Sequence, residues 1–165
     1  MRILLTVCLA IVSHAIFAQQ TITWLGGAPG NETNWHVSKN WSPNRVPDED
    51  SYVVIQYLHS GHNAQPVISG EARAASIQIV DRAYLTIEKG GELVLDGTFI
   101  YTQGFVLMNS TLINRGRIAL FNLDADTSTD YFKGIQNTGI IILDNEVLYH
   151  GNSTRIQRPA FAKKS

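Results

Sequence analysis

The sequence predicts an all-β fold, and two observations lead to it directly. Helical patterning is nearly absent, since no stretch past Gln20 keeps apolar residues at i, i+3, i+4 and i+7 over three turns. Short runs with alternating apolar residues recur instead, rich in Ile, Val, Leu, Tyr and Thr, and Gly, Asn and Asp divide them. Turn-forming residues between β-prone runs are typical of a chain of short strands.

Each expected strand is marked by two apolar residues that lie two positions apart. A period of two places both members of such a pair on the same face of the strand, where the core should lie. In chain order the pairs are Val53 and Ile55, Ile77 and Ile79, Leu85 and Ile87, Leu93 and Leu95, Phe105 and Leu107, Ile118 and Leu120, and Ile140 and Ile142.

The spacing of the central pairs predicts how the strands are arranged. Ile77, Leu85 and Leu93 lie eight residues apart, and the apolar residues two positions later repeat this interval. The links "VDRAY" and "EKGGE" are long enough to turn a corner but lack the Asn-Gly or Asp-Gly pair of a two-residue hairpin. Three eight-residue sides, or about 24 residues per turn, predict a small right-handed parallel β-solenoid (β-helix) of about four turns. An antiparallel β-sandwich is the alternative.

A second repeat follows further along the chain. The segments "STLINRGRIAL" and "KGIQNTGIIIL" share Asn-x-Gly-x-Ile at an offset of 23 residues, from Asn114 to Asn137 and from Gly116 to Gly139. An Asn at a corner can bond its own backbone, and Gly permits a tight bend. We expect the two Asn side chains to stack and to bond to each other along the corner.

The first 18 residues are expected to be a signal peptide. An apolar run follows Arg2, is too short for a stable membrane span and ends at Ala18 before two glutamines. Cleavage leaves 165 − 18 = 147 residues, enough for one domain with a core, and removes Cys8, the only cysteine. A domain without disulfides fits bacterial export, either to the cell exterior or, as the alternative, to the periplasm.

The charge balance and hydropathy exclude two classes of partner. Without Arg2 the chain carries 12 basic and 14 acidic residues, so its formal charge of −2 does not attract nucleic acid. No second apolar segment reaches the length of about 20 residues that a spanning helix needs, so membrane insertion is not expected. The expected organisation is a signal peptide at 1–18, an N-terminal cap segment at 19–52, a β-solenoid at 53–150 and a C-terminal tail at 151–165.

The stretch "NWSPNRVPDEDSYVVI" precedes the first of the paired strands. The first turn of a solenoid exposes unpaired backbone and apolar surface unless a cap covers it. Trp24, Trp35 and Trp41 supply large apolar side chains for such a cap. Sugar stacking on one of these indoles is the alternative, ligand-binding interpretation. The acids of "PDEDSY" are interpreted as solvated turn residues, with Asp50 placed to accept hydrogen bonds from backbone amides.

Four segments, "TITWLGG", "NWHVSKNWSPNRVPDEDSYVVI", "QPVISGEARAASIQI" and "AYLTIEKGGELVLDG", occur in an order that resembles a known family. It is similar to the N-terminal part of β-solenoid segments in large secreted or surface proteins of bacteria with a type IX secretion route. The resemblance covers Thr21 to Gly97 and implies the fold without implying a ligand. Such proteins usually end in a sorting domain, whereas this sequence ends in "RPAFAKKS", so a free secreted protein, a periplasmic protein or a truncated relative is expected. The matching positions are Trp24, Trp35, Asn40, Trp41, Val46, Pro47, Asp50, Pro66, Gly90 and Gly91.

Two polar segments are candidate metal sites. The segment "DADTSTD" has oxygen ligands at alternate positions, as a calcium loop does. However, Thr129 stands where a calcium loop has its sharp-turn Gly, and Ile135 stands where it has its closing Glu. His59 and His62 lie three residues apart without a third zinc ligand nearby. Surface loops are the expected interpretation of both, and no cofactor is expected, with calcium as the alternative. The candidate calcium ligands are Asp124, Asp126, Ser128 and Asp130.

Nothing in the sequence specifies a catalytic centre. The enzymes to consider are β-helix polysaccharide lyases and hydrolases, which need two carboxyls across a groove, or a base with a cation. Charged residues at expected corners supply candidates without placing them together. They are Asp81, Arg82, Asp96, Arg115, Arg117 and Asp144.

The function expected is therefore a non-catalytic, exported structural or adhesive module that presents a solenoid face to a glycan or a surface protein. A polysaccharide-active enzyme is the alternative. Exposed aromatic side chains would mark the binding face, and the candidates are Tyr52, Tyr57, Tyr84, Phe99 and Tyr101. The last strands, near "GIIILDNEVLYH", are a candidate edge for pairing with a second copy.

Overall fold

The computed structural model describes residues 20–58, 64–97, 104–122 and 134–150, and these residues form an all-β fold. A single 3-10 turn, η1 (Ser38–Asn40), interrupts the strands. No helix in the described part of the chain is long and apolar enough to cross a membrane. The strands are β1 (Gln20–Trp24), β2 (Trp41–Ser42), β3 (Ser51–Ile55), β4 (Val67–Ile68), β5 (Glu71–Ala74), β6 (Ser76–Val80), β7 (Tyr84–Ile87), β8 (Glu92–Asp96), β9 (Phe105–Met108), β10 (Thr111–Asn114), β11 (Arg117–Phe121), β12 (Ile135–Asn137), β13 (Ile140–Leu143) and β14 (Glu146–His150).

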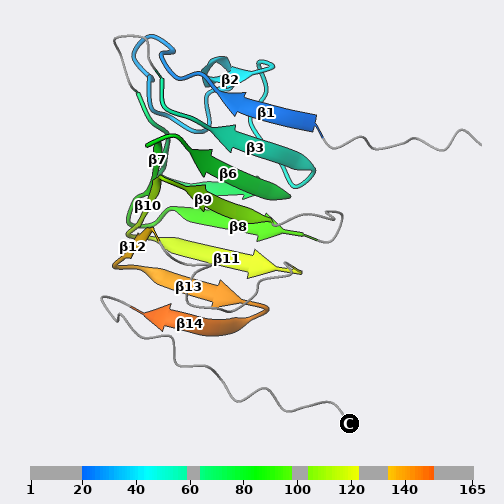
Figure 1. The fold of residues 1–165 in the computed structure, drawn as a ribbon, viewed down its shortest axis with the longest axis vertical. Helices are drawn as coiled ribbons and strands as arrows, with labels where there is room; N and C mark the ends of the chain where they lie inside the picture. The colour runs from blue at the N-terminus through cyan, green and yellow to red at the C-terminus, as the bar shows by residue number, and fades with distance from the viewer. Residues whose placement is uncertain (1–19, 59–63, 98–103, 123–133, 151–165) are drawn as a thin grey trace, which may run out of the picture.

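The strands form three sheets that run along the long axis of the molecule (Figure 1). Sheet A has the order β2-β1-β3-β6-β9, sheet B has β12-β10-β7-β4, and sheet C has β14-β13-β11-β8-β5. From β3 to β11 the chain visits sheets A, B and C in turn, so strands that pair are separated by two strands in sequence. The strand pairs are parallel apart from β1 with β2 and β13 with β14.

The eight-residue interval corresponds to one strand on each sheet. Ile77 lies in β6, Leu85 in β7 and Leu93 in β8, and all three side chains are completely buried. The interval between paired strands is longer than eight residues. Ile77 pairs with Phe105, and Leu85 pairs with Leu112. The interval between turns therefore varies, and the links between strands absorb the difference.

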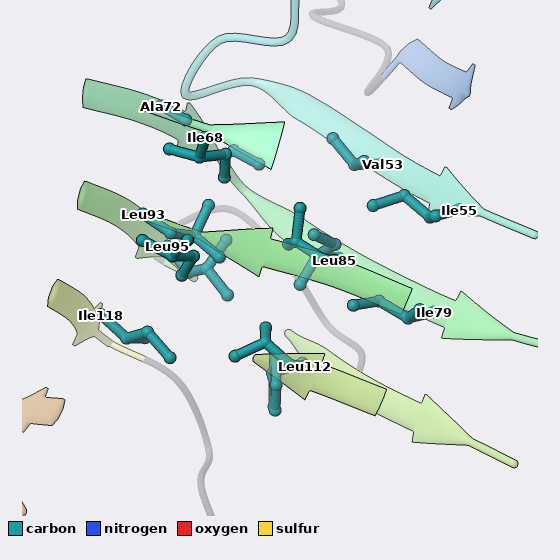
Figure 2. Close-up of a cluster of buried hydrophobic side chains, with 14 of the residues drawn as sticks. Val53, Ile55, Ile68, Ala72, Ile79, Leu85, Leu93, Leu95, Leu112 and Ile118 are labelled. Atoms are coloured by element: carbon teal, nitrogen blue, oxygen red, sulfur yellow. The ribbon is translucent and has the colours of Figure 1, made fainter. Parts of the chain in front are cut away.

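The core lies between the three sheets. Figure 2 shows aliphatic side chains from different strands gathered in one interior, with Ile68 and Ala72, Leu93 and Leu95, and Leu85 and Leu112 among them. Parallel pairing places buried side chains of neighbouring strands beside one another, as it does for Leu85 and Leu112, so adjacent strands bury each other's apolar face. At about 25 cal/mol for each Å² of apolar surface removed from water, this burial is the main stabilising contribution.

The buried face of the strand at 140–143 differs from the sequence prediction. The predicted inward pair, Ile140 and Ile142, is half-buried, and Ile141 and Leu143 are the buried residues. The cause is the register, which places Ile141 beside Ile118 of β11. A run of consecutive isoleucines carries no alternation of its own, so the neighbouring strand decides which face is buried.

The alternating apolar pairs predicted β3, β6, β7, β8, β9, β11 and β13 but not β1, β2, β4, β5, β10, β12 and β14. Strand β1 lies in the segment assigned to the cap, yet it pairs in parallel with β3 and extends sheet A. Strand β5 reads "EARA", whose alanines have weak strand preference, and it forms because Ala72 and Ala74 pair beside Leu93 and Leu95 of β8.

The last strand turns back on its neighbour. Asp144 and Asn145 both adopt positive φ, 45° and 70°, and this turn brings β14 antiparallel to β13. The pairing is irregular between Ile141 and Ile142. Strand β13 is thus paired on both sides, and the outer edge of sheet C at this end belongs to β14 (Figure 1).

Candidate functional site

Three tryptophans close the N-terminal end of the interior. The ring centroids of Trp24 and Trp41 lie 4.7 Å apart at 79°, and those of Trp35 and Trp41 lie 4.6 Å apart at 76°. Trp24 Nε1 donates to the Ala64 carbonyl at 2.7 Å, and Trp41 Nε1 donates to the Trp35 carbonyl at 2.7 Å. Among the described residues, Trp35 Nε1 has no hydrogen-bond partner.

This packing removes the three indoles from the list of ligand-binding candidates. Trp24, Trp35 and Trp41 are each 0% exposed, so no ring offers a face to a sugar while the core is closed. The edge-to-face contacts explain the burial, because each ring shields its neighbour from water. The geometry supports the first interpretation of these residues, as a cap, over the alternative of sugar stacking.

Asn40 organises the loop that carries these tryptophans, a role that the sequence pattern did not reveal. Its side chain is completely buried. Its Oδ1 accepts from the Ala28 amide at 2.8 Å, and its Nδ2 donates to the carbonyls of Asn31 and Asn34 at 2.6 and 3.0 Å. A fully bonded amide inside a loop holds the backbone in place, which is a structural rather than a catalytic role.

Asp48, rather than Asp50, is the acid that bonds the turn before β3. Its carboxylate accepts from Ser51 Oγ at 2.7 Å and from the Asp50 amide at 3.3 Å, and it pairs with Arg45 at 2.6 Å. Burial acts to raise the pKa of Asp48, but the hydrogen bonds from Ser51 and Arg45, together with the charge of Arg45, outweigh it. The pKa of this carboxyl is therefore lowered.

Both candidate metal segments lie outside the described residues. These are the loop with Asp124, Asp126, Ser128 and Asp130, and the segment with His59 and His62. Within the part of the chain that the structure describes, no three His, Cys, Asp or Glu residues lie close enough together to hold a metal ion.

The candidate catalytic residues occupy four separate places, and Asp96 and Asp144 share one of them. Asp81 and Arg82 lie at the corner between β6 and β7, whereas Arg115 lies at the corner between β10 and β11 and bonds Glu88 at 2.9 Å. Arg117 lies on the outer face of β11 and pairs with Glu92 at 3.1 Å.

Asp96 and Asp144 come together at the carboxyl ends of β8 and β13. Asn122 lies between them, since its Nδ2 donates to Asp96 at 2.9 Å and its amide donates to Asp144 at 3.1 Å. Strands β8 and β13 both pair with β11 and so lie about 9.6 Å apart, and an inverting hydrolase would need a water between its two carboxyls. Here Asn122 occupies that position and bonds both acids, so the arrangement is a polar ladder.

In the described part of the chain, Tyr84 is the candidate aromatic residue that lines a hollow. Tyr84 is 38% exposed, whereas Tyr52 and Tyr57 are half-buried, and Phe99 and Tyr101 lie outside the described residues. The hollow has a volume of about 500 Å³ and lies over the outer face of sheet B. Its lining includes Arg82, Tyr84, Asn109, Thr111, Ile113 and Gln136.

Backbone pairing fixes the position of these residues. Tyr84 in β7 pairs with Thr111 in β10, and Ile113 in β10 pairs with Gln136 in β12. Arg82 and Asn109 lie at successive copies of one corner, where the Arg82 amide donates to the Asn109 carbonyl at 2.7 Å. Of the candidate aromatic residues, the sequence could name Tyr84 but could not distinguish it from Tyr52.

A comparison with protein families finds a matching family model. Residues 23–119 match the family model described as "Domain of unknown function (DUF8693)", which is more than half of the chain. The chain belongs to this family. The DUF8693 region runs from β1 through β11 and so includes the tryptophan cluster and the hollow except for Gln136. No curated protein and no solved structure matches the chain significantly.

Proposed function

We propose that this DUF8693 protein is a non-catalytic, exported structural or adhesive module. In this proposal it is a right-handed β-solenoid of about four turns that presents an outer face to a glycan or a surface partner. The parallel pairings and the rotation of the chain through three sheets support the coiled arrangement over the antiparallel sandwich. The signal peptide at 1–18 remains part of the proposal.

The observation that carries the proposal is the axial pairing of polar side chains. Asn114 Nδ2 donates to Asn137 Oδ1 at 2.7 Å, from one turn to the next. The ion pair of Arg115 with Glu88 also joins successive turns. Polar groups that bond along the axis hold a stack together, whereas an active site needs them to converge on one reacting atom.

The Asn pair confirms what the repeat in the sequence predicted. Asn114 is completely buried, its Oδ1 accepts from the Gly116 amide at 3.1 Å, and its Nδ2 also donates to the Ile140 carbonyl at 3.1 Å. Its hydrogen-bonding groups thus fix the corner of its own turn and the start of β13. This network favours a rigid scaffold over a mobile catalytic loop.

Retention on surfaces tests the proposal directly. The purified protein is applied to a panel of immobilised polysaccharides and to intact bacterial cells, and release of soluble sugar is followed in the same samples. We expect retention on at least one surface without release of sugar. Steady release of sugar would identify the alternative, a polysaccharide-active enzyme. Failure to bind any polysaccharide or any cell surface would contradict the proposal.

A further inference from the structure

We propose that the hollow beside Tyr84 binds one pyranose unit of a neutral polysaccharide. This inference rests on the proposed adhesive function and names its ligand class and its site. Three independent features of the hollow carry it: the decreasing size of one column of side chains, the chemistry of its lining, and the backbone conformation of its corner residues.

The first feature is shape. The column on the outer face of sheet B next to the corner begins with Tyr84 and continues with Thr111. A large ring followed by a small side chain leaves open space beside the ring, where the hollow lies. An aromatic ring next to such a space offers a flat apolar surface of the kind that the C–H face of a pyranose covers.

The second feature is the chemistry of the lining. Asn109 and Gln136 are exposed amides, and each can donate and accept hydrogen bonds, as sugar hydroxyls also do. Thr111 adds a hydroxyl, and Ile113 adds an apolar side chain. Among the described residues, the lining includes no carboxylate of the kind that glycoside hydrolysis requires. These groups suit recognition of an uncharged polyol.

Charge also favours a neutral sugar over an acidic one. Arg82 is the one charged residue in the lining, and its guanidinium carbon lies 5.4 Å from the centre of the Tyr57 ring. The neighbouring residue, Asp81, is exposed and carries the opposite charge. The two adjacent residues therefore carry no net formal charge, which does not favour an anionic ligand, and the Arg82 guanidinium can donate hydrogen bonds to sugar hydroxyls.

The third feature is the backbone of the corner. Arg82 and Asn109 both adopt left-handed dihedrals, with φ of 66° and 50°. At the other corner of the same turn Gly90, with φ of 88°, meets the same requirement without a side chain. A left-handed Arg is uncommon and costs free energy, and here this conformation places Arg82 at the rim of the hollow.

The inference is tested with variants of the full-length protein on the polysaccharide that retains it best. Tyr84→Thr removes the ring and keeps a strand-forming residue, and we expect binding to weaken roughly tenfold. Asn109→Gly removes one amide but suits the left-handed backbone, so we expect several-fold weaker binding with no loss of thermal stability. Tyr52→Thr makes the same change as Tyr84→Thr on the outer face of sheet A and is the matched control, with binding expected to stay unchanged.

The outcomes separate this inference from the proposed function. Binding that survives Tyr84→Thr and Asn109→Gly would overturn the site while leaving the adhesive function in place. Binding that falls steeply with added salt, or that selects acidic polysaccharides, would overturn the neutral ligand class, since an uncharged sugar is insensitive to ionic strength. Retention on cells without retention on any polysaccharide would likewise overturn the inference alone, and no retention anywhere would overturn both.

Discussion

Replacing single tryptophans by phenylalanine measures what holds the N-terminal end of the core. Trp41 contacts the rings of both other tryptophans and donates from Nε1 to the buried Trp35 carbonyl at 2.7 Å. Trp35 contacts one ring, and its own Nε1 has no partner among the described residues. Both side chains are 0% exposed, so the two substitutions remove similar volume from similar surroundings.

The hydrogen bond therefore accounts for most of the expected difference in the free energy of unfolding between Trp41→Phe and Trp35→Phe. Each substitution leaves a small cavity, and this cost is largely shared. Trp41→Phe also leaves the Trp35 carbonyl buried without a donor, which costs about 1–3 kcal/mol. Trp35→Phe instead removes an N–H group that made no hydrogen bond. We expect Trp41→Phe to lower the free energy of unfolding by about 1–3 kcal/mol more than Trp35→Phe.

The measurement is urea denaturation followed by far-ultraviolet circular dichroism, because fluorescence would change with the substituted indole. An unchanged m-value is needed for the free energies to be comparable. Trp24→Phe is the control for ring contacts. Trp24 contacts one ring, as Trp35 does, but its Nε1 donates a hydrogen bond to the Ala64 carbonyl at 2.7 Å. It should fall between the other two variants. Equal losses for Trp35→Phe and Trp41→Phe would refute the role assigned to the hydrogen bond.

Three further predictions follow from the stacked turns and from the turn before β3. Gly116→Ala should cost about 1–3 kcal/mol or more, because a Cβ there would collide with the backbone carbonyls of the preceding turn, whereas Gly70→Ala meets ordinary contacts and should cost far less in the same denaturation experiment. Asn114→Ala should cost roughly 2–4 kcal/mol, since it leaves buried groups of the corner unpaired, and a loss no larger than that of Asn137→Ala, a half-buried position, would contradict this. Because the pKa of Asp48 is lowered in the folded state, its contribution is complete above the unfolded value near 3.8 and is lost as pH falls through the folded value. Melting temperatures measured across acidic pH should accordingly fall less steeply for Asp48→Asn than for the parent protein.

The sequence predicted the all-β fold and its short strands wherever apolar residues alternate between turn residues. Ile77, Leu85 and Leu93 repeat every eight positions, so each marks one strand, and the Asn114 and Asn137 repeat marks one corner. Alternation is a local property that one sequence records. Pairing register depends on the neighbouring strand and is not a local property of the sequence. For this reason the inward face of the strand at 140–143 was predicted wrongly and strand β5 was missed.

The candidate site was harder to predict for a related reason. Trp24, Trp35 and Trp41 have the composition of a sugar-binding surface, and their burial follows from contacts between residues distant in sequence. Tyr52 and Tyr84 both precede apolar strand residues. Their difference in exposure arises from neighbours on adjacent turns, because Tyr52 donates to Gln78 at 3.0 Å, whereas Tyr84 lies beside a hollow.

The corner between sheets B and C and the corner between sheets A and B differ in the side chains that they can accommodate. This difference indicates where a ligand-binding site can form. At the corner between sheets B and C, a Cβ at Gly116 or Gly139 would collide with the carbonyl of the preceding turn, so turns approach too closely there for side chains. At the corner between sheets A and B, Arg82 and Asn109 adopt similar left-handed dihedrals and still carry long polar groups. Substitution at the first corner is limited by stability, whereas the second tolerates a range of side chains over the same backbone. Recognition of a ligand can therefore be built at the corner beside Tyr84 without changing the stack that supports it.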